Sequence, residues 1–454
     1  MAELVGYRRI HMVGVAGSGM SGLAKMFAQA GHRVTGSDIK PAAVLRVLEG
    51  AGVETWVGHR PERAGEWDLV VASSAIPEAD PELVAAAGAG VPVWARPVLL
   101  DALTARVPTV GVTGTHGKTT TTAMMVTALH ALGRDPSFLV GGEMIDLNNS
   151  AHLGQEPLLV LEADEAFGTF SGLDLAALAI TNIEADHLDH YRTLGALQAA
   201  FGDVATRVAG PVVACVDDPG VRSLMDAVPS VVGYGTSTDA TWRVEGIDHR
   251  RSAVAFTLAG PTGSVSVTVP KPGDHVARNA AAVLALLGEM GLDVVAAAEG
   301  LSRYAGVRRR FEIKGVFGDT LVVDDYAHHP TEVAATIAAA SLGHHGEVIV
   351  VFQPHRYTRT ADLGHDLGLA LAGADRVFVT DVYAAGEVPI PGVTGRLVAE
   401  AAAGAGATVE YVPTRQALAS AVHRSVRPGS LVLLLGAGDI TLVADELVVL
   451  LADS

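Results

Sequence analysis

Residues 108–122 read PTVGVTGTHGKTTTT, and this stretch decides the fold of the chain around it. Its first six residues have the composition of a short buried strand, and its end continues into an alanine-containing helical segment. A glycine-rich loop between a strand and a helix is typical of a P-loop. The backbone N–H groups of such a loop surround phosphates, Lys118 can reach the β- and γ-oxygens, and Thr119 can ligate magnesium.

One position departs from the strict pattern G-x-x-x-x-G-K-[ST]. Val112 stands where glycine is expected, and the nearest glycines are Gly111 and Gly114. The Gly-Lys-Thr core in a strand–loop–helix context still predicts that the loop binds ATP. The residues expected to contact ATP are Gly114, Thr115, His116, Gly117, Lys118, Thr119 and Thr120.

A second glycine-rich turn lies near the start of the chain. Residues 9–15 are a short apolar run, Gly17, Gly19 and Gly22 then satisfy G-x-G-x-x-G, and residues 33–38 form a second strand that ends in Asp38. This order predicts that a diphosphate binds at a helix N-terminus and that Asp38 lies beside a ribose. It does not identify the molecule that carries the diphosphate. The same spacing also occurs where only a tight turn and close helix packing are required.

The C-terminal part again alternates apolar strands with helical segments. The expected strands are 320–326, 347–352, 376–380 and 430–435, whereas residues 229–270 are β-rich with strict alternation at 264–269. Alternating strands and helices predict parallel, doubly wound sheets. We therefore expect an α/β protein of three domains: a Rossmann-like domain over 1–105, a central P-loop ATPase with a parallel sheet and a small β-rich part over 106–312, and a Rossmann-like domain over 313–454.

Acidic clusters follow two strands of the central domain. Glu162-Ala163-Asp164-Glu165 comes after residues 158–161, and residues 184–190 (EADHLDH) come after 178–183. Residues beyond the carboxyl ends of parallel strands line the binding crevice, so these groups are expected to converge on the P-loop. Carboxylates there can hold magnesium, and a histidine can add a softer contact. For any single acid, a solvated strand end is an equally good interpretation.

Arginines and histidines form a further set in the C-terminal part. Residues 306–311 contain three consecutive arginines, and the spacing of three between Arg356 and Arg359 predicts a shared helical face. Arginine offers a planar fork of donors for carboxylate or phosphate, although a basic surface turn is the simpler interpretation. His329 precedes Pro330 and is expected near a helix cap, whereas His328 is expected to point into the crevice.

Composition restricts the class of protein. The chain of 454 residues has a net charge of −18, which argues against general affinity for nucleic acid. No uncharged apolar stretch approaches the ~18 residues that span a bilayer, and the N-terminus lacks a signal-peptide pattern. The lone Cys215 excludes an internal disulfide and is expected to be a small buried side chain. We expect a cytoplasmic enzyme without membrane or nucleic-acid partners, either a monomer or a weak homodimer.

Taken together, these motifs resemble those of the Mur ligase family of peptidoglycan synthesis. The resemblance runs from about Ile10 to Ile440. It depends on eight ordered segments: 17–22, 114–121, 162–165, 182–189, 309–311, 324–332, 353–360 and 381–387. The run FQPHRYTR at 352–359 in particular is similar to that of the family members that add L-alanine.

The resemblance implies a function in cell wall biogenesis, and hence in cell shape and division. It implies ATP-dependent ligation of L-alanine to the lactyl carboxylate of UDP-N-acetylmuramate through an acyl phosphate, with ATP and two Mg²⁺ ions. The residues that would hold the UDP-sugar are Gly17, Ser18, Gly19, Met20, Ser21, Asp38, Ser73 and Ser74. Those that would surround L-alanine are His328, Arg356 and Arg359.

The resemblance also assigns roles around ATP. Thr119 and Glu162 would hold one magnesium ion and His187 the second, while Asn279 would meet adenine and Arg310 the phosphates. The catalytic set would then be Lys118, Glu162, His187 and Arg310.

The sequence departs from the family pattern at three positions. Ala166-Phe167 replaces the usual Ser-Asp after the acidic motif, and Val276 replaces an asparagine after His275. No lysine lies between Lys118 and Lys271, so the carbamylated lysine of some Mur ligases has no counterpart.

Three other functions fit parts of the pattern. A sister ligase that attaches a whole tripeptide during wall recycling shares most motifs. A nicotinamide-dependent dehydrogenase would explain Gly17, Gly19, Gly22 and Asp38 but leaves the P-loop unexplained. A non-enzymatic nucleotide switch leaves the acids and the arginine pair without a role.

Overall fold

The computed structural model describes residues 6–250, 252–342, 344 and 346–453, apart from the side chains of Ser18 and Asp189. The chain forms two compact units. The first comprises Met1–Glu245, Thr257–Val267 and Arg278–Tyr304, and the second comprises Gly246–Phe256, Thr268–Ala277 and Ala305–Ser454.

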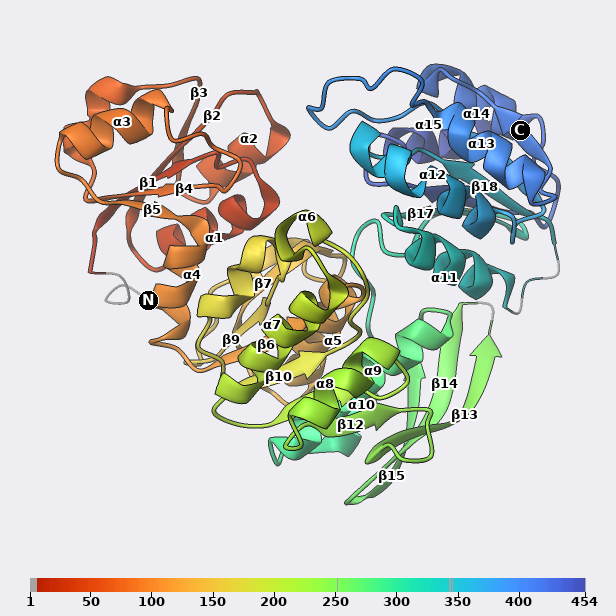
Figure 1. Ribbon diagram of the computed structural model, residues 1–454, viewed down its shortest axis with the longest axis horizontal. Coiled ribbons are helices and arrows are strands. Elements are labelled where there is room, and N and C mark those ends of the chain that lie inside the picture. The colour runs from red at the N-terminus through yellow and green to blue at the C-terminus, as the bar shows by residue number, and fades with distance from the viewer. Residues whose placement is uncertain (1–5, 251, 343, 345, 454) are drawn as a thin grey trace. The chain divides into compact units, whose positions relative to one another are not determined.

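The first unit begins with a five-stranded parallel sheet in the order β3-β2-β1-β4-β5. The strands are β1 (Arg9–Val13), β2 (Arg33–Asp38), β3 (Glu54–Val57), β4 (Leu69–Ala72) and β5 (Val93–Ala95). The helices are α1 (Ser18–Gln29), α2 (Ala43–Gly50), η1 (Pro61–Glu66), α3 (Pro81–Gly88) and α4 (Arg96–Thr104) (Figure 1). Side chains alternate along β1, so Ile10 and Met12 pack in one core and Val13 in another. Both faces of this sheet are therefore covered, as parallel sheets require.

The P-loop strand β6 lies in a second, larger sheet in the order β15-β14-β13-β12-β11-β10-β6-β9-β7-β8. Its strands are β6 (Thr109–Thr113), β7 (Ser137–Met144), β8 (Asn149–His152), β9 (Leu159–Glu162), β10 (Ala177–Ile180), β11 (Val212–Cys215), β12 (Val232–Gly235), β13 (Trp242–Arg250), β14 (Ala253–Gly260) and β15 (Gly263–Val269). The helices are α5 (Lys118–Ala131), η2 (Ala166–Gly172), α6 (Leu188–Tyr191), α7 (Leu194–Arg207), α8 (Pro219–Ala227), α9 (Asp274–Glu289) and α10 (Val294–Leu301). Because β6 pairs in parallel with both β9 and β10, the loops after these three strands meet at one edge.

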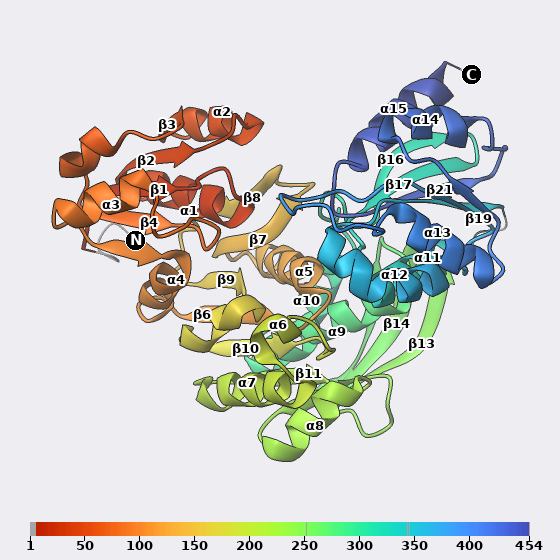
Figure 2. The same ribbon diagram turned by 45° about the horizontal axis from the view of Figure 1, so that its top comes forward.

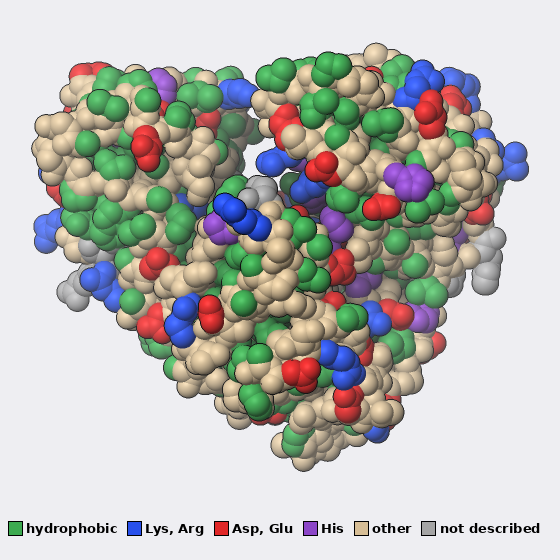
Figure 3. All heavy atoms as spheres, in the orientation of Figure 1, with side chains coloured by type: hydrophobic (Ala, Val, Ile, Leu, Met, Phe, Trp, Pro, Cys, Tyr) green, Lys and Arg blue, Asp and Glu red, His purple; other side chains and the backbone are tan. Residues whose placement is uncertain are grey.

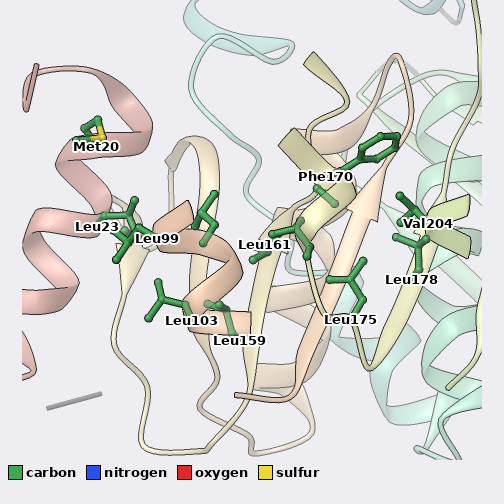
Figure 4. Close-up of a cluster of buried hydrophobic side chains, with 14 of the residues drawn as sticks. Met20, Leu23, Leu99, Leu103, Leu159, Leu161, Phe170, Leu175, Leu178 and Val204 are labelled. Carbon is green, nitrogen blue, oxygen red and sulfur yellow. The ribbon is translucent and has the colours of Figure 1, made fainter. Parts of the chain in front are cut away.

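A continuous core joins these two sheets within the first unit. Figure 4 shows Leu99 of α4 beside Leu23 of α1, and Leu103 close to Leu159 of β9. Figure 2 shows α1 next to β7 and β8. Gly22 allows this close approach, because a Cβ there would lie 2.9 Å from the Cβ of Ala151. The glycine-rich helix start and the P-loop strands are thus packed into one unit.

The second unit contains a six-stranded sheet in the order β16-β17-β21-β18-β19-β20. Its strands are β16 (Glu312–Phe317), β17 (Thr320–Asp325), β18 (Val348–Phe352), β19 (Arg376–Val379), β20 (Val409–Tyr411) and β21 (Leu431–Leu435). Its helices are α11 (Pro330–Ser341), α12 (Tyr357–Leu371), α13 (Gly395–Gly404), α14 (Arg415–His423) and α15 (Thr441–Ala452). Only β16 is antiparallel, and the apolar strands β18 and β21 are buried along their whole length.

The predicted fold class is confirmed, including the parallel sheets and the β-rich part of the central region. Strands end slightly earlier than the apolar runs that predict them, because the last residues turn into the loops; β1 ends at Val13 rather than at residue 15. On the face shown in Figure 3, lysine and arginine side chains are interspersed with acidic ones. In the part of the chain that the structure describes, no helix is long and apolar enough to cross a membrane.

Candidate active site

The P-loop follows β6 and leads directly into α5. Gly117 has a φ of 84° at the start of the helix and Gly114 has a φ of 130°, conformations that L side chains rarely adopt. A Cβ at Gly114 would also lie 2.9 Å from the backbone of Asn182. The two glycines are therefore required for the tight path of the loop.

The ammonium group of Lys118 is folded back against its own loop. Its Nζ donates hydrogen bonds to the carbonyl of Gly114 at 2.7 Å and to Glu165 Oε2 at 2.8 Å, and lies 3.7 Å from Asp164. Burial alone would lower the pKa of Lys118, but the charges of Glu165 and Asp164 raise that pKa overall. Lys118 is therefore cationic at neutral pH.

A hydroxyl and a carboxylate meet beside the first turn of α5. Thr119 Oγ1 donates to Glu162 Oε2 at 3.2 Å, and the backbone N–H of Gly141 donates to Glu162 Oε1. A Cβ at Gly141 would lie 2.8 Å from Glu162 Oε2 and 3.0 Å from Thr119 Oγ1. Glycine at position 141 thus leaves room for oxygen ligands at this point.

A second group of possible metal ligands lies beside Lys118. One ligand atom each from Asp164, Glu165 and His187 lie within 4.8 Å of one another. His187 has a φ of 54° at the start of α6, in the left-handed region that histidine adopts more readily than most other non-glycine residues. Oxygen donors with one imidazole suit a hard divalent cation, so the residues present fit magnesium.

Residues after β10 support the P-loop. The amide of Asn182 accepts from His116 N at 2.8 Å and donates to the His116 carbonyl at 3.0 Å. Thr181 Oγ1 donates to the same carbonyl at 2.6 Å, and Thr115 Oγ1 accepts from Glu184 N at 2.9 Å. The loop is thus held in place by the neighbouring strand end.

Asn279, the predicted adenine contact, is buried on α9 beside the phosphate loop. A Cβ at Gly117 would lie 3.0 Å from Asn279 Oδ1. The structure thus brings Asn279 together with the P-loop.

The N-terminal glycine-rich loop is fixed by the end of β2. The carbonyl of Ser37 accepts from Gly14 N at 2.9 Å and Val15 N at 3.0 Å, and Asp38 Oδ2 accepts from Ala16 N at 3.1 Å. Of the predicted UDP-sugar residues, Met20 and Ser21 are buried, Ser73 is half-buried, and Gly17 and Ser74 are exposed. The side chain of Ser18 lies outside the described residues.

The second unit has its own polar cluster after β17. The guanidinium of Arg310 lies over the ring of Tyr326 at 5.2 Å and 3.9 Å from Glu332. His328 Nδ1 lies 3.5 Å from Glu332 Oε2, and its ring centroid lies 5.9 Å from that of His355.

The histidines of this cluster stay neutral at physiological pH. Burial lowers the pKa of His328, and Arg359 lowers it further. Burial, the neighbouring His328 and the positive charge of Arg359 together lower the pKa of His355 to about 4. The structure therefore places Arg359 and Arg310 near His328.

The prediction that Arg356 shares a helical face with Arg359 is wrong. Helix α12 begins at Tyr357, and Arg356 precedes it with a φ of 70°. The N–H of Arg356 donates to the carbonyl of Tyr383 at 2.9 Å, which holds the chain outside the helix. Arg356 is exposed there. By contrast, His329 caps α11 as predicted, in a capping box with Glu332.

Two residues around the site lack a motif of their own. Glu165 pairs with Lys118 and is 1% exposed. The acidic segment 162–165 indicated that carboxylates lie near the P-loop, but it did not single out Glu165. Arg96, at the start of α4, faces Gly19 and carries no sequence signal, because a single arginine after an apolar strand is common.

Known proteins share this architecture and sequence. Family models match along the chain: the Mur ligase family catalytic domain at residues 9–107, the Mur ligase middle domain at 112–287 and the Mur ligase glutamate ligase domain at 309–438.

Similar relatives include two curated enzymes and one solved structure. UDP-N-acetylmuramate–L-alanine ligase of Mycolicibacterium vanbaalenii is 42% identical over 97% of this chain and 95% of its own. The enzyme of the same name from Anaeromyxobacter is 42% identical over 98% of both chains. The crystal structure of UDP-N-acetylmuramate-alanine ligase from Thermotoga maritima has a TM-score of 0.84 and 29% identity, over 98% of this chain and 99% of the other. The chain therefore belongs to the Mur ligase family and is an ATP-dependent amide-bond-forming ligase.

Proposed function

We propose that this protein joins L-alanine to the lactyl carboxylate of UDP-N-acetylmuramate, using ATP, in the synthesis of peptidoglycan precursors. The observation that carries the proposal is the P-loop lysine and threonine facing Glu162, Asp164 and Glu165 within a Mur ligase fold. Relatives at about 42% identity over nearly the whole chain carry this activity in their names.

Two magnesium ions are proposed to accompany ATP. Thr119 and Glu162 would hold one, and His187, near Asp164 and Glu165, the other. Bound there, the ions would offset the negative charge of the phosphates as they approach the substrate carboxylate.

We propose that the reaction passes through an acyl phosphate. The lactyl carboxylate attacks the γ-phosphorus and ADP leaves; the amine of L-alanine then attacks the acyl carbon and inorganic phosphate leaves. Lys118 contributes a fixed positive charge beside the β- and γ-oxygens, and Arg310 is proposed to contact the phosphates. No covalent bond to the protein is required, since positioning and charge supply the rate.

The amino acid is proposed to bind in the cluster of the second unit. The guanidinium groups of Arg359 and Arg356 would bind its carboxylate, and the neutral His328 would lie beside it. A neutral imidazole does not repel an incoming ammonium, which must lose a proton before it can act as a nucleophile.

The tripeptide-adding sister activity is the alternative that shares this fold. A murein peptide ligase of Psychrobacter arcticus has a TM-score of 0.68 and 24% identity, which shows the fold alone. Phosphate release from ATP in the presence of UDP-N-acetylmuramate, with either L-alanine or the tripeptide, separates the two. Release with the tripeptide alone would overturn the proposal. The dehydrogenase alternative would require NADH binding, measurable by fluorescence titration.

The proposed domain borders lie near residues 105 and 312, and the proposed location is the cytoplasm. We propose a monomer or a weak homodimer, which sedimentation velocity tests directly.

A further inference from the structure

A hollow in the first unit lies between the glycine-rich start of α1 and the acidic segment that follows β9. Its volume is about 140 Å³, well above the ~10–15 Å³ that one water needs by the same measure. It is lined by Gly19 and Gly22 of α1, Arg96 and Leu100 of α4, Leu139, Val140 and Gly141 of β7, Ser150 of β8, and Leu161, Glu162 and Asp164. One wall thus belongs to the expected UDP-sugar site and another to the expected magnesium site.

Arg96 supplies the positively charged side chain among these lining residues. It is the first residue of α4, and its guanidinium lies against Gly19: a Cβ there would be 2.6 Å from both Cζ and Nη2. The Nε of Arg96 is buried and has no hydrogen-bond partner. An arginine remains charged at neutral pH, so a buried N–H of the guanidinium without an acceptor is costly.

The surroundings of Arg96 indicate which kind of group would accept a hydrogen bond from its guanidinium. The negative charges of Asp164 and Glu162 act on Arg96 through space. Both carboxylates belong to the groups that fit magnesium. An oxyanion in the hollow would accept from the guanidinium while lying next to those carboxylates and their cation. Arginine is well suited to this, because its planar fork binds carboxylate or phosphate with two parallel hydrogen bonds.

We propose that Arg96 binds an oxyanion of the UDP-sugar in this hollow and sets the position of that substrate between Gly19 and Glu162. The assignment rests on the proposed function, since it takes the UDP-sugar as the substrate. The oxyanion comes either from the diphosphate or from the lactyl carboxylate. Gly19 is then required not only for the turn but also to make room for the guanidinium.

The test is calorimetric titration of Arg96→Ala and Arg96→Lys with UDP-N-acetylmuramate. Because Arg96→Ala removes a charge-assisted hydrogen bond, it should weaken binding roughly 10- to 100-fold. Arg96→Lys should restore only part of the affinity, because a point charge cannot replace the fork. Arg106→Ala is the matched control, since Arg106 is exposed just beyond the same helix.

ATP affinity and the unfolding midpoint provide the folding control. Both should remain near the wild-type values in Arg96→Lys. If the guanidinium had only a structural role, the unfolding midpoint of this variant would fall. Unchanged affinity of Arg96→Ala for UDP-N-acetylmuramate overturns the assignment of Arg96 alone. Failure of the wild-type protein to bind this UDP-sugar would instead contradict the proposed function.

UDP-N-acetylglucosamine distinguishes the two sources of the oxyanion, because it has the diphosphate but no lactyl group. Equal weakening of both ligands by Arg96→Ala assigns the guanidinium to the diphosphate. Weakening of UDP-N-acetylmuramate alone assigns it to the lactyl carboxylate. Gly19→Ala, whose methyl group would collide with the guanidinium, should reproduce the pattern seen with Arg96→Ala.

Discussion

The Nζ atom of Lys118 lies 2.8 Å from Oε2 of Glu165, a carboxylate that is 1% exposed. The ammonium that is proposed to contact the phosphates is therefore already paired with a carboxylate of the same protein. Because both groups are shielded from water, each is costly to leave alone. Glu165 thus stabilises the P-loop and sets the charge of Lys118.

Glu165→Gln should destabilise the nucleotide-free protein. Removing one partner of a buried ion pair costs about 3–5 kcal/mol, since the other charge remains without compensation. Asp164→Asn is the matched control: its carboxyl group is 46% exposed and 3.7 Å from Nζ, so its loss should cost at most about 1 kcal/mol. Urea denaturation of both variants measures the difference. Equal losses of unfolding free energy in the two variants would show that the burial of Glu165 does not account for the stabilisation.

Lys118→Ala should reduce ATP-dependent ligation by at least about 10²-fold, the usual loss on removing one preorganised electrostatic contact to a transition state. Binding of UDP-N-acetylmuramate, measured by calorimetry, should remain because Lys118 lies outside the N-terminal glycine-rich loop. Near-full ligation by the purified variant would refute the role assigned to this residue.

Glu82 should make the first unit sensitive to acid. Burial alone would raise its pKa, but hydrogen bonds from Ser37 and the backbone N–H of Arg60, together with His11, lower the pKa to about 2. A carboxyl group whose pKa is depressed on folding adds stability above its ordinary pKa near 4.5 and loses this contribution as the pH falls toward 2.

The free energy of unfolding should therefore fall between pH 5 and pH 3 in the wild-type protein and fall less in Glu82→Gln. The full contribution is on the order of 3 kcal/mol. Denaturant titrations at several pH values measure the slopes. Parallel slopes for the two proteins would rule out this origin of the acid sensitivity.

Arg359→Lys should raise the KM for L-alanine about tenfold, because lysine cannot form two parallel hydrogen bonds to a carboxylate. The KM for ATP should stay within about twofold if the residue contacts only the amino acid. Arg424→Lys is a suitable control, since it lies just beyond α14 in the same unit. A change in the KM for ATP without a change in the KM for L-alanine would contradict the assignment of Arg359 to the amino acid.

Cys215 should be inert in the native protein. Its thiol is buried in β11, and burial raises its pKa to about 11, so little thiolate forms at neutral pH. An aromatic disulfide reagent should therefore react with it only after denaturation. Rapid modification of the native protein would contradict the burial of this strand.

Much of the fold could be predicted because the glycine-rich turns and apolar runs are local signals. The strand at β6, the Gly-Lys-Thr loop and the alternating strands of the second unit all follow from patterns within a few residues of one another. The acidic segment at 162–165 predicted, for the same reason, that carboxylates lie beside the P-loop lysine.

The other features of the site depend on contacts between residues that lie far apart in the sequence, and no local pattern predicts such contacts. Arg96 is 77 residues from Gly19 along the chain, and only the packing of α4 on α1 brings them together. Arg356 shows the converse: its spacing from Arg359 suits a helix, but the backbone hydrogen bond to Tyr383 delays the start of α12. Tertiary hydrogen bonding outweighs local spacing at this position.

Analysis of the product by mass spectrometry tests the central claim most directly. Purified protein is incubated with ATP, magnesium, UDP-N-acetylmuramate and an equimolar mixture of free amino acids, with the tripeptide in a parallel reaction. We expect UDP-N-acetylmuramoyl-L-alanine as the main product, formed together with stoichiometric ADP and phosphate. A product that carries another amino acid or only the tripeptide, or no product while ATP is hydrolysed, would contradict the account.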